Sequence, residues 1–331
     1  MIGRRHVDLV RQREYCTSAG PRLKSRLSAL LHVIPRDKPV VYFDYPVHGN
    51  VGDLLIHLAT DRFFHEHGYH VARTFSWRPR GRHARRVPSD ATLVFHGGGN
   101  LGDLYPGHER LRQAMLERYP DHKAVIMPQS IHYSTPDARD RSLAAYARYR
   151  DLTICARDDV SRDLLASYSD IGHLMIPDMT HQLEDALPAV VDRTRRSDAL
   201  FFLRTDKERD EQRSARFPEM GAEDQSWDWE RLLTARDATW IQRHNTLHKY
   251  LYLANLDRVA YETWSGYRAR ILRRALALFQ GANHVYTDRL HGGLFALLTG
   301  APVTLADNNN GKIGHYHRTW LSGHPDVTIR D

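Results

Sequence analysis

Short apolar runs alternate with helix-like segments along most of this chain. The runs 124–127 and 152–155 are almost entirely apolar, and each precedes a turn and a segment with helical spacing of apolar residues. Strands of a parallel sheet are covered on both faces, so this pattern predicts parallel strands joined by helices. The expected strands are residues 38–43, 92–95, 124–127, 152–155, 173–176, 199–203, 284–286 and 302–305. The expected helices are residues 54–64, 109–119, 138–149, 158–168, 247–256, 265–279, 290–298 and 313–320.

The alternation is interrupted around residues 184–198, where charged and small residues follow one another without periodicity. We therefore expect an α/β fold of two doubly wound, Rossmann-like domains whose strand ends face each other across a cleft. The highly charged segment 205–240 is expected to form a long excursion, comparable to a lid. The expected division is a helical arm at 1–35, an N-terminal domain at 36–185, a linker at 186–198 and a C-terminal domain at 199–331.

The composition is that of an ordinary globular protein, with 41% hydrophobic and 26% charged residues in 331. No apolar run is long enough to span a bilayer, and the polar, Arg-rich start lacks the apolar stretch of a secretory signal. The two cysteines, Cys16 and Cys155, lie far apart, which is typical of a reducing compartment. We therefore expect a cytoplasmic protein without a disulfide framework.

The chain is basic, with 47 Lys and Arg against 40 Asp and Glu and a formal net charge of +7. Such an excess either reflects a bias of composition or attracts phosphates, nucleic acids and anionic lipid head groups. Arginines cluster between Arg78 and Arg86, where Pro79 and Gly81 favour an exposed loop. The loop predicts peripheral contact with an anionic membrane. Because no RNA-binding motif accompanies it, we do not expect nucleic acid as a partner.

One pattern occurs twice after expected strands, as Gly49–Leu54 and as Gly99–Leu104. Glycines let a backbone approach closely, so such loops can present N–H groups to an anion or a sugar. Two tight turns capped by aspartate would need the same glycines, but the repeated Asn and Asp favour a function. Either aspartate is a candidate hydroxyl ligand or base. The candidates are His48, Asn50, Gly52 and Asp53 for the first copy and Gly98, Gly99, Asn100 and Asp103 for the second.

Basic and polar residues also follow other expected strands. Arg289 and His291 come after one strand, Arg204 and Thr205 after another, and Gln129 after a third. Arginine offers a planar fork to phosphate or carboxylate, and histidine can donate a hydrogen bond or relay a proton near neutral pH. A surface charge, a helix cap and a salt bridge at a strand end would explain the same basic residues structurally.

The chain lacks the short motifs of several other enzyme classes. It has no His-Glu-x-x-His sequence and no Cys–His cluster, so we expect no metal site. The absence of Gly-x-Ser-x-Gly argues against an α/β-hydrolase. Neither glycine loop matches the dinucleotide fingerprint or contains the lysine of a P-loop. We therefore expect no bound cofactor.

Together and in this order, the motifs resemble the polysaccharide pyruvyl transferase family of bacterial exopolysaccharide biosynthesis. The resemblance implies a fold like that of the GT-B glycosyltransferases. It also implies transfer of a pyruvyl group from phosphoenolpyruvate to two hydroxyls of a sugar, which forms a ketal and releases phosphate. The segments that carry the resemblance are Asp44–Asp53, His96–Tyr105, Pro128–Ile131, Leu203–Asp206 and Thr287–Gly292.

The resemblance further implies roles for individual residues. Phosphoenolpyruvate would lie on the C-terminal domain against Arg289, His291 and, by a weaker match, Arg204. The sugar acceptor, free or lipid-linked, would lie on the N-terminal domain near Asp53 and Asp103. Ketal formation needs an acid near the donor and a base near the acceptor hydroxyls. His291 is the candidate acid and either aspartate the candidate base, while Arg289 would stabilise the departing phosphate.

Two other functions stay open from the residues alone. A nucleotide-sugar glycosyltransferase of GT-B type would share the cleft and the glycine loops, but it would bind a nucleoside diphosphate sugar instead of phosphoenolpyruvate. A non-catalytic protein that binds glycans or polyanions through its basic surface would bind ligand without releasing phosphate.

Overall fold

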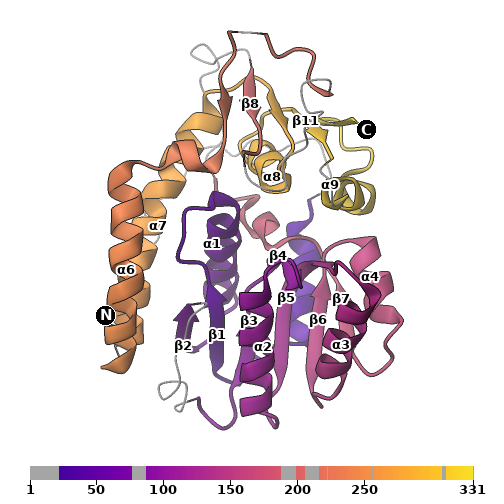
Figure 1. Ribbon diagram of the computed structural model, residues 1–331, viewed down its shortest axis with the longest axis vertical. Coiled ribbons are helices and arrows are strands. Elements are labelled where there is room, and N and C mark those ends of the chain that lie inside the picture. Colours follow the sequence, from indigo (N-terminus) through magenta and orange to yellow (C-terminus); the bar gives the residue numbers. More distant parts are fainter. Residues whose placement is uncertain are drawn as a thin grey trace.

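The computed structural model describes residues 22–76, 87–187, 199–205, 216–221, 223–254, 256–307 and 311–330. Its strands form two sheets, and each strand pairing within the described ranges is parallel. In Figure 1 the first sheet lies in the lower half of the molecule and the second in the upper half. The prediction of an α/β chain with parallel sheets is confirmed.

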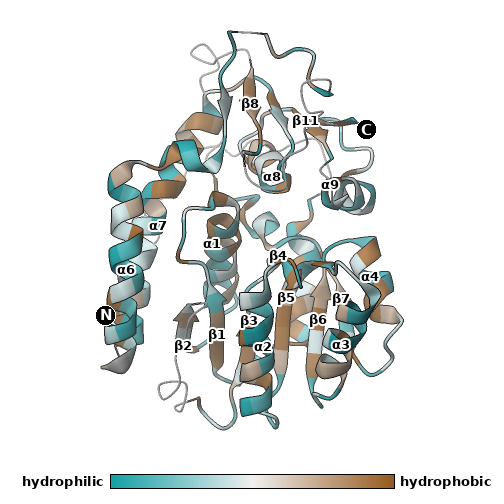
Figure 2. Cartoon of the chain, viewed as in Figure 1, coloured by the Kyte–Doolittle hydropathy of each residue, from teal (hydrophilic) through white to brown (hydrophobic). Residues whose placement is uncertain are grey.

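The first sheet has seven strands in the order β2-β1-β3-β5-β6-β7, with the short β4 beside β5. Successive side chains of a strand point to opposite faces, so Val41 and Phe43 pack with α2, α3 and α4, whereas Val40 and Tyr42 pack with α1. Figure 2 shows the apolar strands in brown between these helices. The strands are β1 (Val40–Tyr45), β2 (Val71–Ser76), β3 (Thr92–Phe95), β4 (Gly98–Gly102), β5 (Ala124–His132), β6 (Leu152–Ala156) and β7 (Gly172–Met175). The helices are α1 (Val51–Glu66), α2 (Pro106–Arg118), α3 (Pro136–Ala147) and α4 (Asp159–Ala166).

The second sheet has five strands in the order β12-β11-β10-β8-β9. Its strands are short, and α8 and α9 follow β10 and β11 as in the repeated units expected from the sequence. The helix α8 has the bounds predicted for it. The strands are β8 (Leu200–Phe202), β9 (Ser226–Trp227), β10 (Val285–Thr287), β11 (Val303–Ala306) and β12 (Val327–Arg330). The helical elements are α8 (Leu290–Leu298), α9 (Lys312–Tyr316) and the π-helical turn η5 (His317–Leu321).

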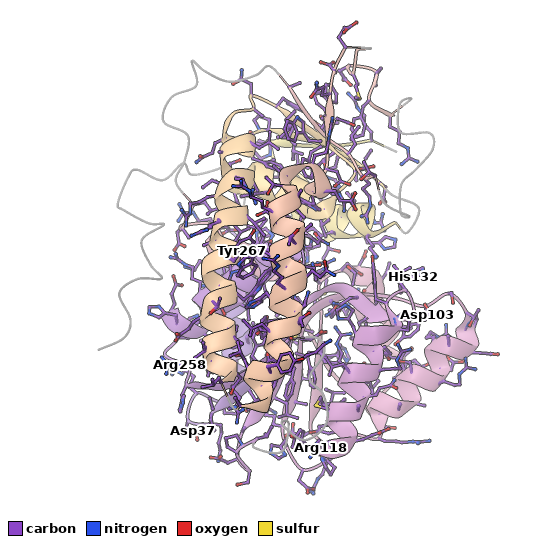
Figure 3. The ribbon with its side chains drawn as sticks, turned by 60° about the vertical axis from the view of Figure 1, so that its left-hand side comes forward. Asp37, Asp103, Arg118, His132, Arg258 and Tyr267 are labelled. Carbon is purple, nitrogen blue, oxygen red and sulfur yellow. The ribbon has the colours of Figure 1, made fainter. Side chains whose placement is uncertain are left out.

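Two long helices, α6 (Ala235–Leu253) and α7 (Asp257–Gln280), run side by side along the molecule (Figure 3). Helix α7 contacts α1 and β2 of the first half and α8 and η4 (Trp229–Leu232) of the second. Both helices begin earlier than the sequence predicted, and Thr234 and Asp237 form the capping box that starts α6. In the described ranges, no helix is both long and apolar enough to cross a bilayer.

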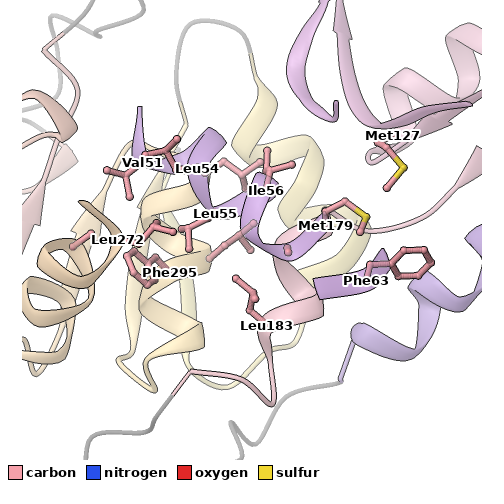
Figure 4. Packing of buried hydrophobic residues seen from close by; sticks show 14 of the residues in the cluster. Val51, Leu54, Leu55, Ile56, Phe63, Met127, Met179, Leu183, Leu272 and Phe295 are labelled. Atoms are coloured by element: carbon pink, nitrogen blue, oxygen red, sulfur yellow. The ribbon is translucent and has the colours of Figure 1, made fainter. Parts of the chain in front are cut away.

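A continuous hydrophobic core joins the two halves of the molecule. Leu54 of α1, Leu272 of α7 and Phe295 of α8 belong to one buried cluster, together with Leu183 of η3 (Met179–Leu183). Figure 4 shows these side chains around α1. The two sheets are therefore fixed to each other by apolar packing as well as by chain connections.

Several expected elements differ from those observed. β5 continues through Pro128 to His132, with a register shift between Ile126 and Gln129 where the proline has no N–H for the ladder. The expected loop after β3 contains β4, and β2 and β12 were not predicted. The expected excursion at 205–240 contains β9, η4 and the start of α6, and its Phe217 and Trp229 are buried.

Other predicted segments lie wholly or partly outside the described residues. These are the first part of the arm (1–21), the Arg-rich loop (77–86), most of the linker (188–198) and part of the charged excursion (206–215 and 222). The described end of the arm forms the 3₁₀ helix η1 (Lys24–His32), which buries Leu27 and Leu30 as its apolar spacing predicted.

Candidate functional site

A cavity of about 340 Å3 lies between the two sheets at the carboxyl ends of their strands. We call it the cationic cavity. Segments that follow β1, β6, β8, β10 and β11 all contribute to it, which is where parallel α/β sheets bind ligands. The predicted residues that line it are His48, Asn50, Asp53, Gly99, Asn100, Arg204, Arg289 and His291.

Basic side chains dominate this cavity. Arg157 lines it from the first sheet, and Arg204, Arg289 and Lys312 line it from the second. A Cβ placed on Gly99 would lie 3.1 Å from Nη2 of Arg157 and 3.7 Å from Nζ of Lys312. The bare Gly99 backbone therefore brings two cations from opposite halves close to one point. Such a concentration of positive charge suits a small ligand with more than one anionic group.

Arg289 is held by a buried carboxylate. Its Nε lies 2.5 Å from Oδ1 of Asp228, and its Nη2 donates to Oδ2 at 2.7 Å. Thr205 does not line the cavity, but its N–H and hydroxyl donate to the same Asp228 at 2.8 and 2.7 Å. Asp228 thus fixes the edge of the guanidinium formed by Nε and Nη2. The sequence suggested that such an edge would pair with a phosphate or carboxylate of a ligand, but here it already pairs with the Asp228 carboxylate.

His291 is held by the buried Asp178. Its Nε2 lies 3.2 Å from Oδ2 of Asp178, and Nη1 of Arg157 lies 2.5 Å from the same oxygen. Burial alone would raise the pKa of the Asp178 carboxyl, but His291 and Arg157 outweigh burial and keep that pKa well below its usual range. Asp178 is therefore a permanent anion that orients one cavity histidine and one cavity arginine.

The first copy of the repeated motif brings a histidine and an aspartate together. Nε2 of His48 lies 3.6 Å from Oδ2 of Asp53, while Nδ1 of His48 accepts a bond of 3.3 Å from the N–H of Asn50. This acceptor role leaves the ring proton on Nε2, the nitrogen that faces Asp53. Desolvation lowers the pKa of His48, although the Asp53 carboxylate opposes the shift. The pair thus places the His48 imidazole directly beside the Asp53 carboxyl group.

Gly52 allows the two halves to meet at this point. A Cβ on Gly52 would lie 2.7 Å from Nδ1 of His291. Glycine therefore lets the start of α1 touch the first turn of α8 and places Asp53 close to His291 in space. Gly98 lies nearby, since a Cβ there would be 3.7 Å from Oδ1 of Asp53.

The second copy is organised differently. Asn100 lines the cavity and is fixed by Gln129, whose Oε1 accepts its N–H at 3.2 Å and whose Nε2 donates to its Oδ1 at 3.1 Å. The buried Arg112 also donates to that Oδ1 and to the Asn100 carbonyl. Gln129 itself is fully buried and does not line the cavity. It supports Asn100 instead of meeting a ligand there.

Asp103 lies outside the cationic cavity. Its carboxylate accepts bonds from the backbone N–H of Ser134, at 2.9 Å, and from the hydroxyl of the same residue. Figure 3 shows Asp103 beside His132, on the outer side of the first half. Its expected position near an acceptor in the cleft is therefore not observed, because β4 carries the chain past the cavity before Asp103 is reached.

The lining also includes residues that were not among the predicted site residues, among them Arg157, Lys312, Tyr105 and His108. Arg157 follows β6 directly, so its position after a strand was a usable signal. Its pairing with Asp158, which caps α4, could equally be interpreted as a helix-capping pair, so Arg157 was not chosen as a site residue. Lys312 had no such signal, since it starts a short helix some distance after β11.

Comparison with known proteins bears on what this cavity does. The sequence profile described as polysaccharide pyruvyl transferase matches residues 50–310 of this chain. The chain belongs to the polysaccharide pyruvyl transferase family. The match includes twelve of the fifteen residues that line the cationic cavity, and His48, Lys312 and Ile313 lie just outside it.

Individual relatives agree with this assignment. EpsO of Bacillus subtilis (strain 168), which is named as a pyruvyl transferase, is 35% identical over 312 residues, covering 93% of each chain. Pyruvyl transferase 1 of Schizosaccharomyces pombe is 28% identical over 310 residues, or 88% of this chain and 72% of that one. A functionally uncharacterized protein of Klebsiella pneumoniae has a crystal structure that covers 94% of this chain and 99% of its own, with a TM-score of 0.56 and 20% identity. That structure supports the fold alone.

Proposed function

We propose that this protein transfers a pyruvyl group from phosphoenolpyruvate to two hydroxyls of a sugar in an exopolysaccharide or its precursor. Membership of the family supports pyruvyl transfer. The observation that carries the choice of donor is the group of cations from both halves around Gly99. Phosphoenolpyruvate presents a phosphate and a carboxylate, and such a ligand needs several positive groups when it leaves water.

In this proposal the donor lies between Arg157 of the first sheet and the three cations of the second sheet, which are Arg204, Arg289 and Lys312. Arg204 is positioned by its backbone N–H, which donates to Oδ1 of Asp288 at 2.7 Å. Arg289 contributes positive charge to the departing phosphate while Asp228 fixes its orientation. No metal ion is needed to balance the charge of this donor.

The proton transfers are assigned to residues near Gly52. His291, held by Asp178, is the acid that protonates C3 of the enol. Asp53, beside His48, is the base that accepts a proton from an attacking hydroxyl. We do not assign this role to Asp103, because Ser134 occupies its carboxylate.

The atoms balance without another reactant. C3 takes up one proton, and C2 becomes an oxocarbenium-like centre to which the first sugar oxygen bonds. The second sugar oxygen then bonds to C2 as the C2–O bond to phosphate breaks. The two hydroxyls lose two protons, one matching the proton gained at C3 and the other leaving with phosphate. The products are a cyclic ketal and inorganic phosphate.

The division into an acceptor domain at 36–185 and a donor domain at 199–331, facing each other in a GT-B-like cleft, is part of this proposal. The placement of Arg204, Arg289 and Lys312 on the second sheet supports the donor side. A cytoplasmic location with peripheral membrane contact is also proposed, on the sequence alone. Sedimentation with anionic vesicles that falls as salt rises would support it, and binding that ignores salt would contradict it.

Product analysis tests the reaction directly. The protein is incubated with phosphoenolpyruvate and a panel of acceptor glycosides, and mass spectrometry is combined with a phosphate assay. We expect a pyruvyl adduct and an equal amount of phosphate. A product formed only from a nucleoside diphosphate sugar would indicate a glycosyltransferase, and binding without phosphate release would indicate a non-catalytic glycan-binding protein. Either result would contradict the proposal.

A further inference from the structure

A second cavity, of about 550 Å3, lies between α6 and the ends of β1 and β2. We call it the α6 cavity. Its lining includes His48, which also lines the cationic cavity, and Gly49 beside it. The two cavities are therefore neighbours with one side chain in common. Helix η4 and the next residue, Leu233, also lie between the two cavities. Trp229 of η4 lines the cationic cavity, and Leu233 lines the α6 cavity.

The chemistry of the α6 cavity differs from that of its neighbour. Gln242, Asn245 and Thr246 offer amide and hydroxyl groups, and Leu233 and Ile241 offer apolar surface. Lys249 is its one cation, and no carboxylate lines it within the described part of the chain. Hydroxyl and amide partners combined with apolar surface are suited to a neutral sugar ring, which has polar edges and apolar C–H faces.

The wall of this cavity also contains a buried histidine. His248 lines the cavity, is 3% exposed, and has no hydrogen-bond partner for Nδ1 among the described residues. Its Nε2 is occupied, at 3.4 Å from the hydroxyl of Tyr45 and 3.3 Å from the carbonyl of Ala260. Burial lowers the pKa of His248 to about 4, so the ring is neutral at physiological pH. The ring therefore contributes an uncharged surface to the cavity wall.

We propose that the α6 cavity binds the sugar acceptor as a neutral glycan, whose reacting hydroxyl pair extends past His48 to Asp53. This inference rests on the proposed pyruvyl transfer, and it adds where the acceptor lies and which helix selects it. It makes α6, a helix from the C-terminal half of the sequence, part of an acceptor site that the sequence assigned to the N-terminal half.

Filling the cavity tests this placement. Ala238 lines it on the exposed side of α6, so Ala238→Phe would occupy space without disturbing the buried core. Thr239→Phe on the same helix is the matched control, because Thr239 is exposed and does not line the cavity. We expect Ala238→Phe to raise the KM for the acceptor glycoside by about 10-fold or more while the Kd for phosphoenolpyruvate stays unchanged. Thr239→Phe should change neither.

A milder variant separates a lost contact from a blocked site. Gln242→Ala removes one polar group from an exposed helix position and should raise the acceptor KM by about 3- to 10-fold with little effect on kcat. An unchanged acceptor KM in both Ala238→Phe and Gln242→Ala would overturn the inference while leaving pyruvyl transfer intact. If wild-type protein neither binds phosphoenolpyruvate nor forms a pyruvyl adduct, the proposed function itself fails.

Discussion

The two copies of the repeated motif have nearly the same sequence and different structures. In Gly49–Leu54, Asn50 accepts the N–H of Gly52 and starts α1, so that Asp53 lies in the first helical turn and lines the cationic cavity. In Gly99–Leu104, the chain instead forms β4 beside β5, and Asp103 lies outside the cavity.

Long-range partners explain this difference. The side chain of Asn100 is taken by Gln129 and Arg112, so it cannot cap a helix as Asn50 does. Gly102 has a φ of 119°, a conformation that side chains rarely adopt, and a Cβ there would collide with the carbonyl oxygen of His132. A local pattern thus supplies a polar loop, and its neighbours in space decide which residues reach the site.

The largest contrast is expected between the two aspartates. Asp53→Asn removes the proposed base and should lower kcat by about 100- to 10,000-fold. Asp103→Asn changes a carboxylate outside the cavity and should leave kcat within about 3-fold of wild type. Steady-state kinetics with saturating phosphoenolpyruvate and acceptor measure both. Equal losses in the two variants would show that the copies act alike, against our assignment.

The two glycines should separate stability from activity. Gly102→Ala forces a side chain into a left-handed conformation and against a backbone carbonyl, so we expect a loss of about 3 kcal/mol in the free energy of unfolding. Gly52→Ala suits the helix α1 but displaces His291, so it should reduce activity by about 10-fold or more with little change in stability. Urea unfolding and kinetics on the same samples distinguish these outcomes. A large loss of stability in Gly52→Ala together with a loss of activity alone in Gly102→Ala would contradict these assignments.

Substitutions of the two asparagines should also differ in their effect on stability, and the residue of the second copy should again have the larger effect. Asn100→Ala leaves the buried Arg112 and Gln129 with lost partners and should cost about 2–3 kcal/mol of unfolding free energy. Asn50→Ala removes only a helix cap and should cost about 1 kcal/mol. Thermal or urea unfolding measures both values. A larger loss for Asn50→Ala would contradict the claim that the second copy is the more firmly held.

Buried histidines beside both copies predict a dependence of stability on pH. Burial lowers the pKa of His57, on α1, and of His96, just before the second copy, well below the usual value. The unfolded chain then binds more protons below about pH 6.5, so stability is greatest above that pH and declines as pH falls. By pH 5 each histidine should lower the free energy of unfolding by up to about 2 kcal/mol. Urea unfolding at several pH values checks this, and His96→Gln should reduce the dependence.

Much of this fold follows from the sequence where the signal is local. The strand Thr92–Phe95 and the helix Leu290–Leu298 were predicted with the observed bounds, because apolar runs and helical spacing identify them directly. The strand β4 could not be predicted, since it forms by pairing with β5, and helix α2 separates these two strands in the sequence. The start of α6 was hidden by charged residues on its exposed face.

The candidate site was likewise predictable only where the signal in the sequence is local. Arg204, Arg289 and His291 were found because they directly follow strands, and the carboxyl ends of parallel strands meet at one edge. The partners that fix them, Asp178 and Asp228, are distant in sequence and carry no motif. Sequence reasoning could therefore name several residues that line the cavity, but it could not tell Asp53 from Asp103.

Binding of phosphoenolpyruvate tests the central claim, that the cationic cavity is the donor site. We choose Arg204 over Arg289 for this test, because removing Arg289 would leave Asp228 buried without its arginine partner. Isothermal titration with phosphoenolpyruvate compares wild type, Arg204→Gln and the control Arg110→Gln, at an exposed position on α2 outside the cationic cavity. We predict a Kd about 10- to 100-fold weaker for Arg204→Gln and unchanged for Arg110→Gln. Equal affinity in all three proteins would place the donor elsewhere and contradict the account.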